Sequence, residues 1–419
     1  MTAEQTAAPT LVLVGGARPV TVSVDNVLDA LRQARARGIR THVVAPAAAL
    51  AATPAVTEAA DAVSAVECTD PETLARWALH QSTPEQPFKA VYALQEMAQV
   101  AVAETAAALG VPGNAPDAVR RVRTKDLCRQ ALAEAGFRQP RVRLCERAEQ
   151  AEEFMTQIPG PWVVKPRDAM GSTGVSLVEH REDLPAAMAA LPERDRFLIE
   201  EFVPGPEFSV EGVFRQGRPQ ILAVTAKDKT APPYFVELGH TLPAPLHPKE
   251  DTRVRDCVTA ALATLGMRVG AFHVEVWLTP DEVVLGEVHG RWGGDWIHRM
   301  LAHAIPGLDI HGLIYDDMLG VERPHPEPAP SRGAAVRYFT PPPGRLVRVQ
   351  GWEEVRRHQA VLYCELTAAV GDRIPTVRRS TDRVGLVVVG ADSAREAEAT
   401  ARELIDSVVF TVEEDGTPC

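Results

Sequence analysis

The stretch from residue 271 to residue 296 constrains the fold most, because it reads as two strands joined by a short turn. Its sequence is AFHVEVWLTPDEVVLGEVHGRWGGDW. Polar and apolar side chains alternate with the period of two that a half-buried strand requires, and the TPD triplet supplies the turn. Folding at that turn brings Glu275 beside Glu287. The stretch therefore predicts an antiparallel hairpin with two carboxylates on one face.

A cation is expected between these carboxylates, since like charges held that close are unfavourable. Oxygen ligands of this kind suit Mg²⁺, which also binds substrate phosphates. Arg291 and the Gly293–Gly294 pair follow at once, and a helix expected over about 296–304 begins after them. Helix N-termini favour anions. The segment thus predicts a magnesium–phosphate site with an arginine beside it.

Length and charge narrow the class of protein. A chain of 419 residues is too long for one core, so two to four domains are expected. The net charge of −12 argues against a general binder of nucleic acid or of anionic membranes. The N-terminus has no signal-peptide pattern, and no apolar run reaches the roughly 18 residues of a membrane span. Six scattered cysteines without a CxxC pair indicate reduced thiols in a cytoplasmic protein.

The two ends of the chain each show an α/β pattern. Short apolar strands at 11–14, 39–45, 63–68 and 90–94 alternate with amphipathic stretches, as in an open α/β sheet, and a boundary is expected near 116. Beyond a proline-rich linker, ERPHPEPAP at 322–330, strand and helix patterns resume. The C-terminal part therefore reads as a third, small α/β unit.

The middle of the chain carries three weaker signals. A strand, WVVKP, ends in Lys165 and Pro166, and the small-residue loop RDAMGSTGV follows it. Such a loop can present backbone N–H groups to phosphates, although an ordinary hairpin explains it equally well and no GxxxxGK[ST] motif occurs. The strand FLIEEFV ends in acidic residues, which also suit a plain sheet edge. Glu237 and His240 lie in a proline-rich loop, where a lone histidine is more often structural than functional.

Seven pieces of the chain follow one another in an informative order. They are Lys125, Lys165–Pro166, GSTGV at 171–175, EEFVPGPE at 200–207, Glu275, Glu287 and Arg291. In this order they resemble the ATP-grasp superfamily, over nearly the whole chain. The resemblance implies an α/β fold of the α+β grasp type. It implies an N-terminal open α/β domain at 1–116, a two-lobed ATP-grasp core at 117–322 with a flexible lid over about 125–200, and a small C-terminal α/β domain at 323–419.

The resemblance implies an ATP site. The lysines would neutralise the phosphates, the glycine loop would close over them, and the acidic strand end would present backbone to adenine and a carboxylate to the ribose. The residues concerned are Lys125, Lys165, Gly171, Ser172, Glu200, Glu201, Val203 and Glu207.

The resemblance also implies that Glu275 and Glu287 hold Mg²⁺ as one or two ions, for which Mn²⁺ can substitute. His289 stands where many members carry asparagine. Imidazole is a poorer Mg²⁺ ligand than an amide oxygen, so His289 is either a metal ligand or a substrate contact.

Within the superfamily, the chain looks like the carboxylate–amine ligases of the L-amino acid (dipeptide) ligase type. The grounds are Glu237 and His240 before the hairpin and Arg291 after it. In that branch the first two face the amino-acid substrate, with the histidine steering or deprotonating the amine. The arginine steadies the carboxylate and the tetrahedral intermediate.

The residues after Arg291 are expected to line the pocket of the first amino acid. Asp295 could pair with a substrate ammonium, Trp292 or Trp296 could supply an apolar wall, and Gly294 would contact the substrate.

The activity implied is the ATP-dependent joining of a carboxylate to an amine through an acyl phosphate, with ADP and phosphate released. The partners implied are a small carboxylate and a small amine, amino acids foremost, with neither nucleic acid nor membrane. A homodimer is the expected assembly. Two alternatives share the nucleotide residues: a biotin-carboxylase-like or purine-pathway carboxylating enzyme, and a non-catalytic ATP-binding protein.

Overall fold

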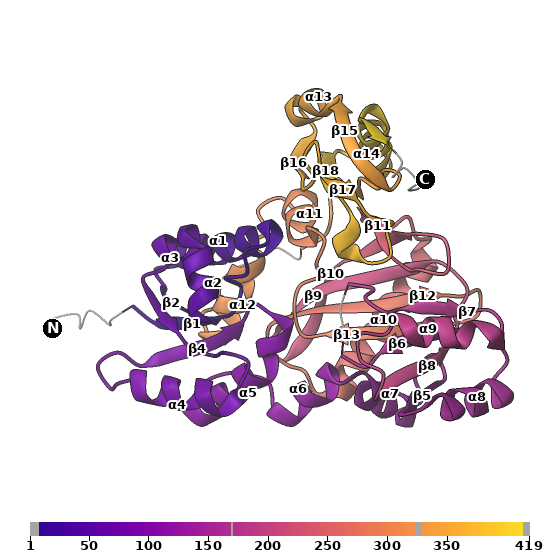
Figure 1. Cartoon of the computed structure of the whole chain (residues 1–419). Helices are drawn as coiled ribbons and strands as arrows, with labels where there is room; N and C mark the ends of the chain where they lie inside the picture. Colours follow the sequence, from indigo (N-terminus) through magenta and orange to yellow (C-terminus); the bar gives the residue numbers. More distant parts are fainter. Residues whose placement is uncertain (1–7, 169–170, 324–327, 414–419) are drawn as a thin grey trace.

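The computed structural model of the protein describes residues 8–168, 171–323 and 328–413. The N-terminal part, a large central part and the C-terminal part surround a common centre (Figure 1). In these ranges no helix is both long and apolar enough to cross a membrane.

The N-terminal part is an open parallel sheet with strand order β3-β2-β1-β4, as the alternation of strands and helices predicts. Leu11 and Leu13 pack toward α1, while Val12 and Val14 pack toward α4 and α5, so the central strand is buried on both faces. This explains its continuous apolar sequence. The bounds are β1 Thr10–Val14, α1 Thr21–Ala36, β2 Arg40–Ala45, α2 Ala47–Ala52, α3 Pro54–Ala59, β3 Ala62–Ala65, α4 Pro71–Gln81, β4 Phe88–Ala93, η1 Glu96–Ala98 and α5 Gln99–Leu109.

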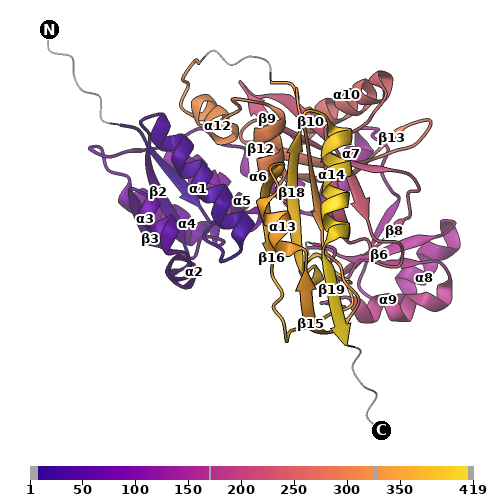
Figure 2. The same cartoon turned by 90° about the horizontal axis from the view of Figure 1, so that it is seen from above.

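A small antiparallel sheet of order β5-β8-β6-β7 follows and has a core of its own. It lies beside the central sheet and carries α8 and α9 (Figure 2). Lys165 lies in β6, as expected. The bounds are α6 Pro116–Arg123, α7 Lys125–Glu134, β5 Val142–Cys145, α8 Ala148–Gln157, β6 Trp162–Pro166, β7 Ser176–Val178, η2 Arg181–Asp183, α9 Leu184–Ala190 and β8 Phe197–Glu201.

The central sheet has eight strands in the order β13-β12-β9-β10-β11-β14-β18-β16. The predicted hairpin is confirmed: β12 and β13 pair antiparallel, with His273 opposite His289. The register shifts between Val274 and Val276, which is where Glu275 lies. The bounds are β9 Glu207–Arg215, β10 Arg218–Lys229, β11 Glu237–Leu242, α10 Pro248–Leu265, β12 Ala271–Leu278, β13 Val283–His289, α11 Ile297–Ala304 and α12 Ile310–Met318.

The C-terminal part contributes strands to the central sheet and also forms a small sheet of its own. Its strands β14, β18 and β16 extend that sheet from β11, and a three-stranded sheet, β17-β15-β19, adds to it. The bounds are β14 Gly333–Tyr338, β15 Gly344–Gln350, α13 Trp352–Arg357, β16 Val361–Leu366, β17 Arg373–Ile374, η3 Ser380–Asp382, β18 Gly385–Ala391, α14 Ala394–Ser407 and β19 Val409–Glu413.

One central helix returns to the N-terminal part. Helix α12 packs against α1, and Arg37 of the α1 C-cap binds Asp309 at 2.8 Å and Asp316 at 3.1 Å. The Arg37 and Asp316 side chains are only 7% and 5% exposed, so their ion pair is shielded from water, whereas the Asp309 side chain is 40% exposed. The contact fixes α1, whose residues Val22, Ser23 and Asn26 line the site, against the second helix after the hairpin.

Candidate active site

A cavity of about 720 Å³ lies where the N-terminal, small and central sheets meet. This volume is in the range of sites for small molecules. Apart from Trp296, every site residue that the sequence analysis selected lines it, although these residues are spread between positions 125 and 295 of the chain. They are Lys125, Lys165, Gly171, Ser172, Glu200, Glu201, Val203, Glu207, Glu237, His240, Glu275, Glu287, His289, Arg291, Trp292, Gly294 and Asp295. Their shared location is therefore established, while their roles stay predictions.

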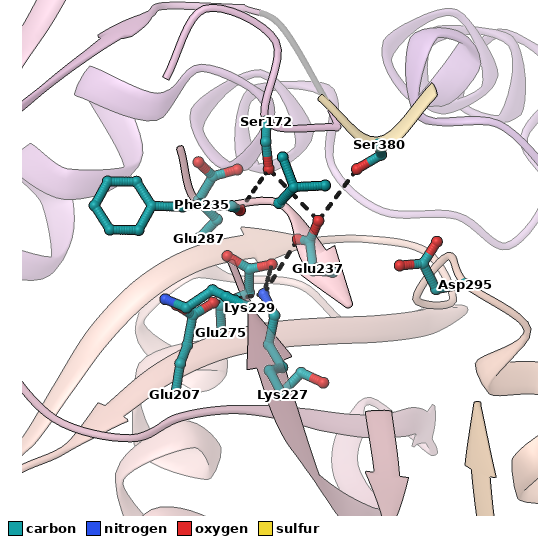
Figure 3. Close-up of polar contacts among 12 residues, drawn as sticks. Ser172, Glu207, Lys227, Lys229, Phe235, Glu237, Glu275, Glu287, Asp295 and Ser380 are labelled. Atoms are coloured by element: carbon teal, nitrogen blue, oxygen red, sulfur yellow. Dashed lines mark hydrogen bonds and ion pairs between the residues drawn. The ribbon is translucent and has the colours of Figure 1, made fainter. Parts of the chain in front are cut away.

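Lys227, at the end of β10, is a site residue to which the sequence analysis gave no role. Its side chain is 3% exposed, and its Nζ lies 2.5 Å from Glu207 Oε1, 2.7 Å from Glu275 Oε1 and 3.7 Å from Glu237 Oε1 (Figure 3). Burial would lower the pKa of Lys227, but the three carboxylates raise it well above its usual value. Lys227 is thus a fixed positive charge in the cavity wall.

The two predicted lysines meet the second hairpin carboxylate. Lys125 Nζ and Lys165 Nζ each lie 3.3 Å from Glu287 Oε1, and Lys165 also binds Glu200 at 3.0 Å. Burial would raise the pKa of the Glu287 carboxyl, yet Lys125 and Lys165 hold it well below its usual value. The arrangement concentrates cationic groups in one corner of the cavity, as a polyphosphate site requires.

Glu275, the first hairpin carboxylate, is held from two sides. Besides Lys227, His273 lies 3.6 Å away through Nε2, and His273 Nδ1 in turn binds Glu211 at 3.0 Å. Burial would lower the pKa of His273, but Glu211 and Glu275 raise it to about 9. His273 is therefore charged at neutral pH and helps to keep Glu275 ionised.

The hairpin supplies a donor set that suits Mg²⁺. Glu275 and Glu287 are carboxylates on neighbouring strands, and both line the cavity. Lysine cations occupy the place beside them in this structure. No group of three His, Cys, Asp or Glu side chains within 8–168, 171–323 and 328–413 is arranged to hold a metal ion. Two carboxylates fill only part of the coordination sphere of Mg²⁺, and water and substrate phosphates commonly supply the remaining ligands. This donor set therefore suits an ion that binds together with the substrate phosphates.

Both ring nitrogens of His289 face carboxylates. Nε2 lies 3.4 Å from Glu287 Oε2, and Nδ1 lies 3.3 Å from Glu96 Oε2. His289 therefore lies on the same face of the hairpin as Glu287, as the sequence predicts. Through Glu96 it also links the hairpin to the N-terminal part.

Glu96 is a second residue that the sequence analysis missed. It lies in η1, just after β4, and its Oε2 binds Arg291 Nε at 2.5 Å; Arg123 approaches its Oε1 at 3.5 Å. Burial would raise the pKa of this carboxyl, but His289 and Arg291 lower it strongly. The sequence did contain one indication of this role. Glu96 follows the carboxyl end of a predicted parallel strand, and α/β sheets bind their ligands at those ends.

Asp295 lines the cavity but already has cationic partners. Arg383 donates to both carboxylate oxygens, at 3.0 and 2.9 Å, and His240 Nε2 lies 3.1 Å from Oδ2. Burial would raise the pKa of Asp295, yet Arg383 and His240 hold it well below its usual value. Arg383, from the C-terminal part, therefore already neutralises the carboxylate that was expected to pair with a substrate ammonium.

The turn that presents Asp295 is strained. Asp295 and Trp296 have φ of 52° and 64°, in the left-handed region that non-glycine residues seldom adopt. Trp296 is 2% exposed and stacks on Tyr363 with ring centroids 3.8 Å apart, which holds the turn in place. Trp292 is 6% exposed and forms part of the wall, as expected.

Comparisons with known proteins identify two domains in the chain. Residues 158–299 match the ATP-grasp domain, and residues 337–413 match the L-amino acid ligase C-terminal domain 2. Uncharacterized protein y4rH of Sinorhizobium fredii is 26% identical over 310 residues, which are 72% of this chain and 64% of that protein. Dapdiamide A synthase of Enterobacter agglomerans is 26% identical over 307 residues, 68% of this chain and 70% of that one.

The fold also matches a solved structure. The crystal structure of L-amino acid ligase from Bacillus licheniformis superposes with a TM-score of 0.77 at 22% identity, covering 98% of this chain and all of that one. The chain spans less than two thirds of the length of y4rH, the first of the relatives above. The two matches lead to one conclusion: the chain contains an ATP-grasp domain, at residues 158–299, and an L-amino acid ligase C-terminal domain 2, at residues 337–413.

Proposed function

We propose that the protein is an ATP-dependent ligase that joins a carboxylate to an amine through an acyl phosphate and releases ADP and phosphate. The observation that carries the proposal is one cavity that holds two lysines, two hairpin carboxylates and Arg291 together. Amino acids, or an acid and an amine that resemble them, are the substrates we propose. The matched L-amino acid ligase domain and the similarity to dapdiamide A synthase support this choice.

In this proposal the lysines and the loop bind the nucleotide. Lys125, Lys165 and Lys227 neutralise the phosphates, and the loop with Gly171 and Ser172 covers them. The adenine and ribose lie by the end of β8 and the start of β9, at Glu201, Val203 and Glu207. Glu200 keeps Lys165 in place, since its carboxylate binds that lysine at 3.0 Å and Arg129 at 2.8 Å.

Glu275 and Glu287 hold Mg²⁺ in the proposed complex, as one or two ions, and Mn²⁺ can replace it. When bound, the metal neutralises charge on the transferred phosphoryl group. The lysines that now contact these carboxylates then turn to the phosphates. His289 keeps Glu287 oriented and remains available as a further ligand.

The chemistry needs no covalent nucleophile on the protein. A substrate carboxylate oxygen attacks the γ-phosphorus of ATP, ADP leaves, and the acyl phosphate forms. The amine then attacks the acyl carbon, phosphate leaves, and the amine loses a proton. Arg291 stabilises the oxyanion of the tetrahedral intermediate, and His240 accepts the proton. Its Nε2 is engaged by Asp295, while its Nδ1 has no hydrogen-bond partner among the described residues.

The first experiment identifies the product. Purified protein, ATP and Mg²⁺ are mixed with the twenty amino acids, products are read by mass spectrometry, and phosphate release is measured in parallel. We expect phosphate release to depend strictly on an amino-acid pair and to match amide formation. Release stimulated by bicarbonate instead would support a carboxylating enzyme, and no release with any pool would support a non-catalytic ATP-binding protein. Either outcome would overturn the proposal.

Glu96→Gln tests whether the N-terminal part positions Arg291. The amide keeps the shape of the side chain but loses its charge-assisted hydrogen bonds to Arg291 and His289. Hydrogen bonds to charged groups contribute about 1.5–3 kcal/mol, so we expect the rate of amide formation to fall roughly tenfold or more. The KM for ATP should change little. Glu104→Gln, which removes a surface ion pair with Arg120, is the matched control and should leave the rate unchanged. An equal rate in both variants would contradict the assignment.

A further inference from the structure

Ser380, in the C-terminal part, joins two other segments at the cavity. Its backbone N donates to Gly171 O at 3.1 Å, and its Oγ donates to Glu237 Oε2 at 3.2 Å. Ser172 Oγ donates to Phe235 O at 2.8 Å and lies 3.5 Å from the same Glu237 oxygen. Figure 3 shows the two serines on different sides of the Glu237 carboxylate. The loop after β6, the start of β11 and η3 therefore meet at one carboxylate.

The turn that carries Ser380 is itself firmly held. Arg383 Nε donates to Ser380 O at 2.8 Å, and its Nη1 donates to Glu237 O at 2.9 Å. The same guanidinium binds Asp295 and lies 3.5 Å from the ring centroid of Tyr338. Since four N–H groups of Arg383 are engaged and its side chain is 9% exposed, η3 is a rigid support.

The loop, in contrast, needs external contacts to keep its conformation. Gly171 and Ser172 are consecutive left-handed residues, with φ of 66° and 56°. The second is not glycine, so this backbone is strained and persists where surrounding contacts hold it. A further backbone bond, from Leu177 N to Pro233 O at 3.0 Å, fastens β7 to the segment before β11. The Ser380 contact is the one that reaches the loop from the C-terminal part of the described chain.

We propose that Ser380 is a positioning residue that fastens the loop at 171–175 over the cavity. This inference rests on the proposed function, because an acyl phosphate in the cavity has to be kept from water. If the loop opens early, water attacks the acyl carbon, phosphate leaves and the free carboxylic acid returns. ATP is then consumed without an amide product. A fastened loop lets the amine arrive before water does.

Ser380→Pro tests the proposal through the coupling of the reaction. Proline has no N–H, so the variant loses the hydrogen bond to Gly171 O as well as the hydroxyl that binds Glu237. Ser380 is the first residue of η3 and follows an extended residue, a position that accepts proline. We expect the phosphate released per amide to rise about two- to tenfold, the range that one hydrogen bond contributes. Ser380→Thr keeps a hydroxyl and should restore the wild-type ratio. Ser407→Ala removes a hydroxyl of α14 that donates to Leu404 O, far from the loop in sequence, and it serves as the matched control.

Hydrogen exchange tests the same contact without turnover. In protein free of nucleotide, we expect the amides of residues 171–178 to exchange faster in Ser380→Pro than in the wild type, with β1 as an unchanged reference. Wild-type exchange in Ser380→Pro, together with a wild-type ratio of phosphate to amide, would overturn the proposal. If the wild type makes no amide from any pair, the proposed ligase function fails, and the exchange measurement still decides whether Ser380 fastens the loop. Thermal melting confirms that each variant is folded.

Discussion

Arg291→Ala is expected to slow amide formation about 10²–10³-fold, the usual cost of losing one donor to a developing oxyanion. Arg291 lines the cavity just after the hairpin, and its Nε is held by Glu96 at 2.5 Å while Nη1 donates to Trp292 O at 2.8 Å. These two bonds leave the other guanidinium N–H groups for the substrate. Nucleotide binding should persist, because Lys125 and Lys165 supply it. The measurements are amide product by mass spectrometry and the Kd of ATP by calorimetry.

Two further variants make the result specific to Arg291. Arg291→Lys keeps the charge but not the planar fork of donors, so we expect only partial recovery. Arg356→Ala removes an exposed arginine of α13 that pairs with Glu353, and it should behave as the wild type. A wild-type rate of amide formation in Arg291→Ala would exclude Arg291 from the chemistry. A variant that neither binds ATP nor melts cooperatively would instead assign Arg291 to stability, since Glu96 would lose a partner.

The parts of the site that the sequence could predict are local ones. The hairpin follows from period-two alternation and a TPD turn within a stretch of the chain, so Glu275 and Glu287 could be placed together without a structure. The lysine at the end of β6 and the loop after it are likewise adjacent in sequence. The N-terminal parallel sheet follows from apolar strands that alternate with amphipathic helices, because each strand is buried on both faces.

The contacts between distant segments could not be predicted in this way. Lys227 is one lysine at the end of an ordinary strand, and only the pairing of β10 with its neighbours brings it to three carboxylates. Arg383 lies 88 residues from Asp295 and neutralises it through the shared sheet. Alternation does not reveal which strands become neighbours. The expected ammonium partner at Asp295 was therefore plausible from sequence, although the carboxylate is already paired.

The predicted C-terminal unit shows the same distinction. Strands β14 and β18 and the last helix are recognisable from local pattern, but the sheet to which these strands belong is not. Because β14 pairs with β11, the C-terminal part is continuous with the sheet that carries the hairpin. This continuity explains how Ser380 and Arg383 can reach the cavity. The boundary near 323 stays a prediction about domains, while the site itself crosses it.

Glu287→Gln is expected to produce the second large effect, through the metal. The amide keeps the size of the side chain but removes the charge that attracts Mg²⁺ and that pairs with Lys125 and Lys165 at 3.3 Å. Metal ions contribute several kcal/mol to transition-state stabilisation in phosphoryl transfer, so we expect the rate to fall on the order of 10²-fold or more. The concentration of Mg²⁺ needed for half-maximal rate should rise as well. Initial rates across a Mg²⁺ titration measure both effects.

The hairpin provides its own control for this variant. Glu282→Gln changes a glutamate in the turn between β12 and β13, whose side chain is 49% exposed and pairs with Arg138. It should leave the Mg²⁺ dependence unchanged. Chelation of Mg²⁺ by EDTA should abolish phosphate release by the wild type, and added Mn²⁺ should restore it. If Glu287→Gln keeps the wild-type Mg²⁺ dependence, the carboxylate serves only to hold the two lysines. The metal would then have to bind through Glu275 and the phosphates alone.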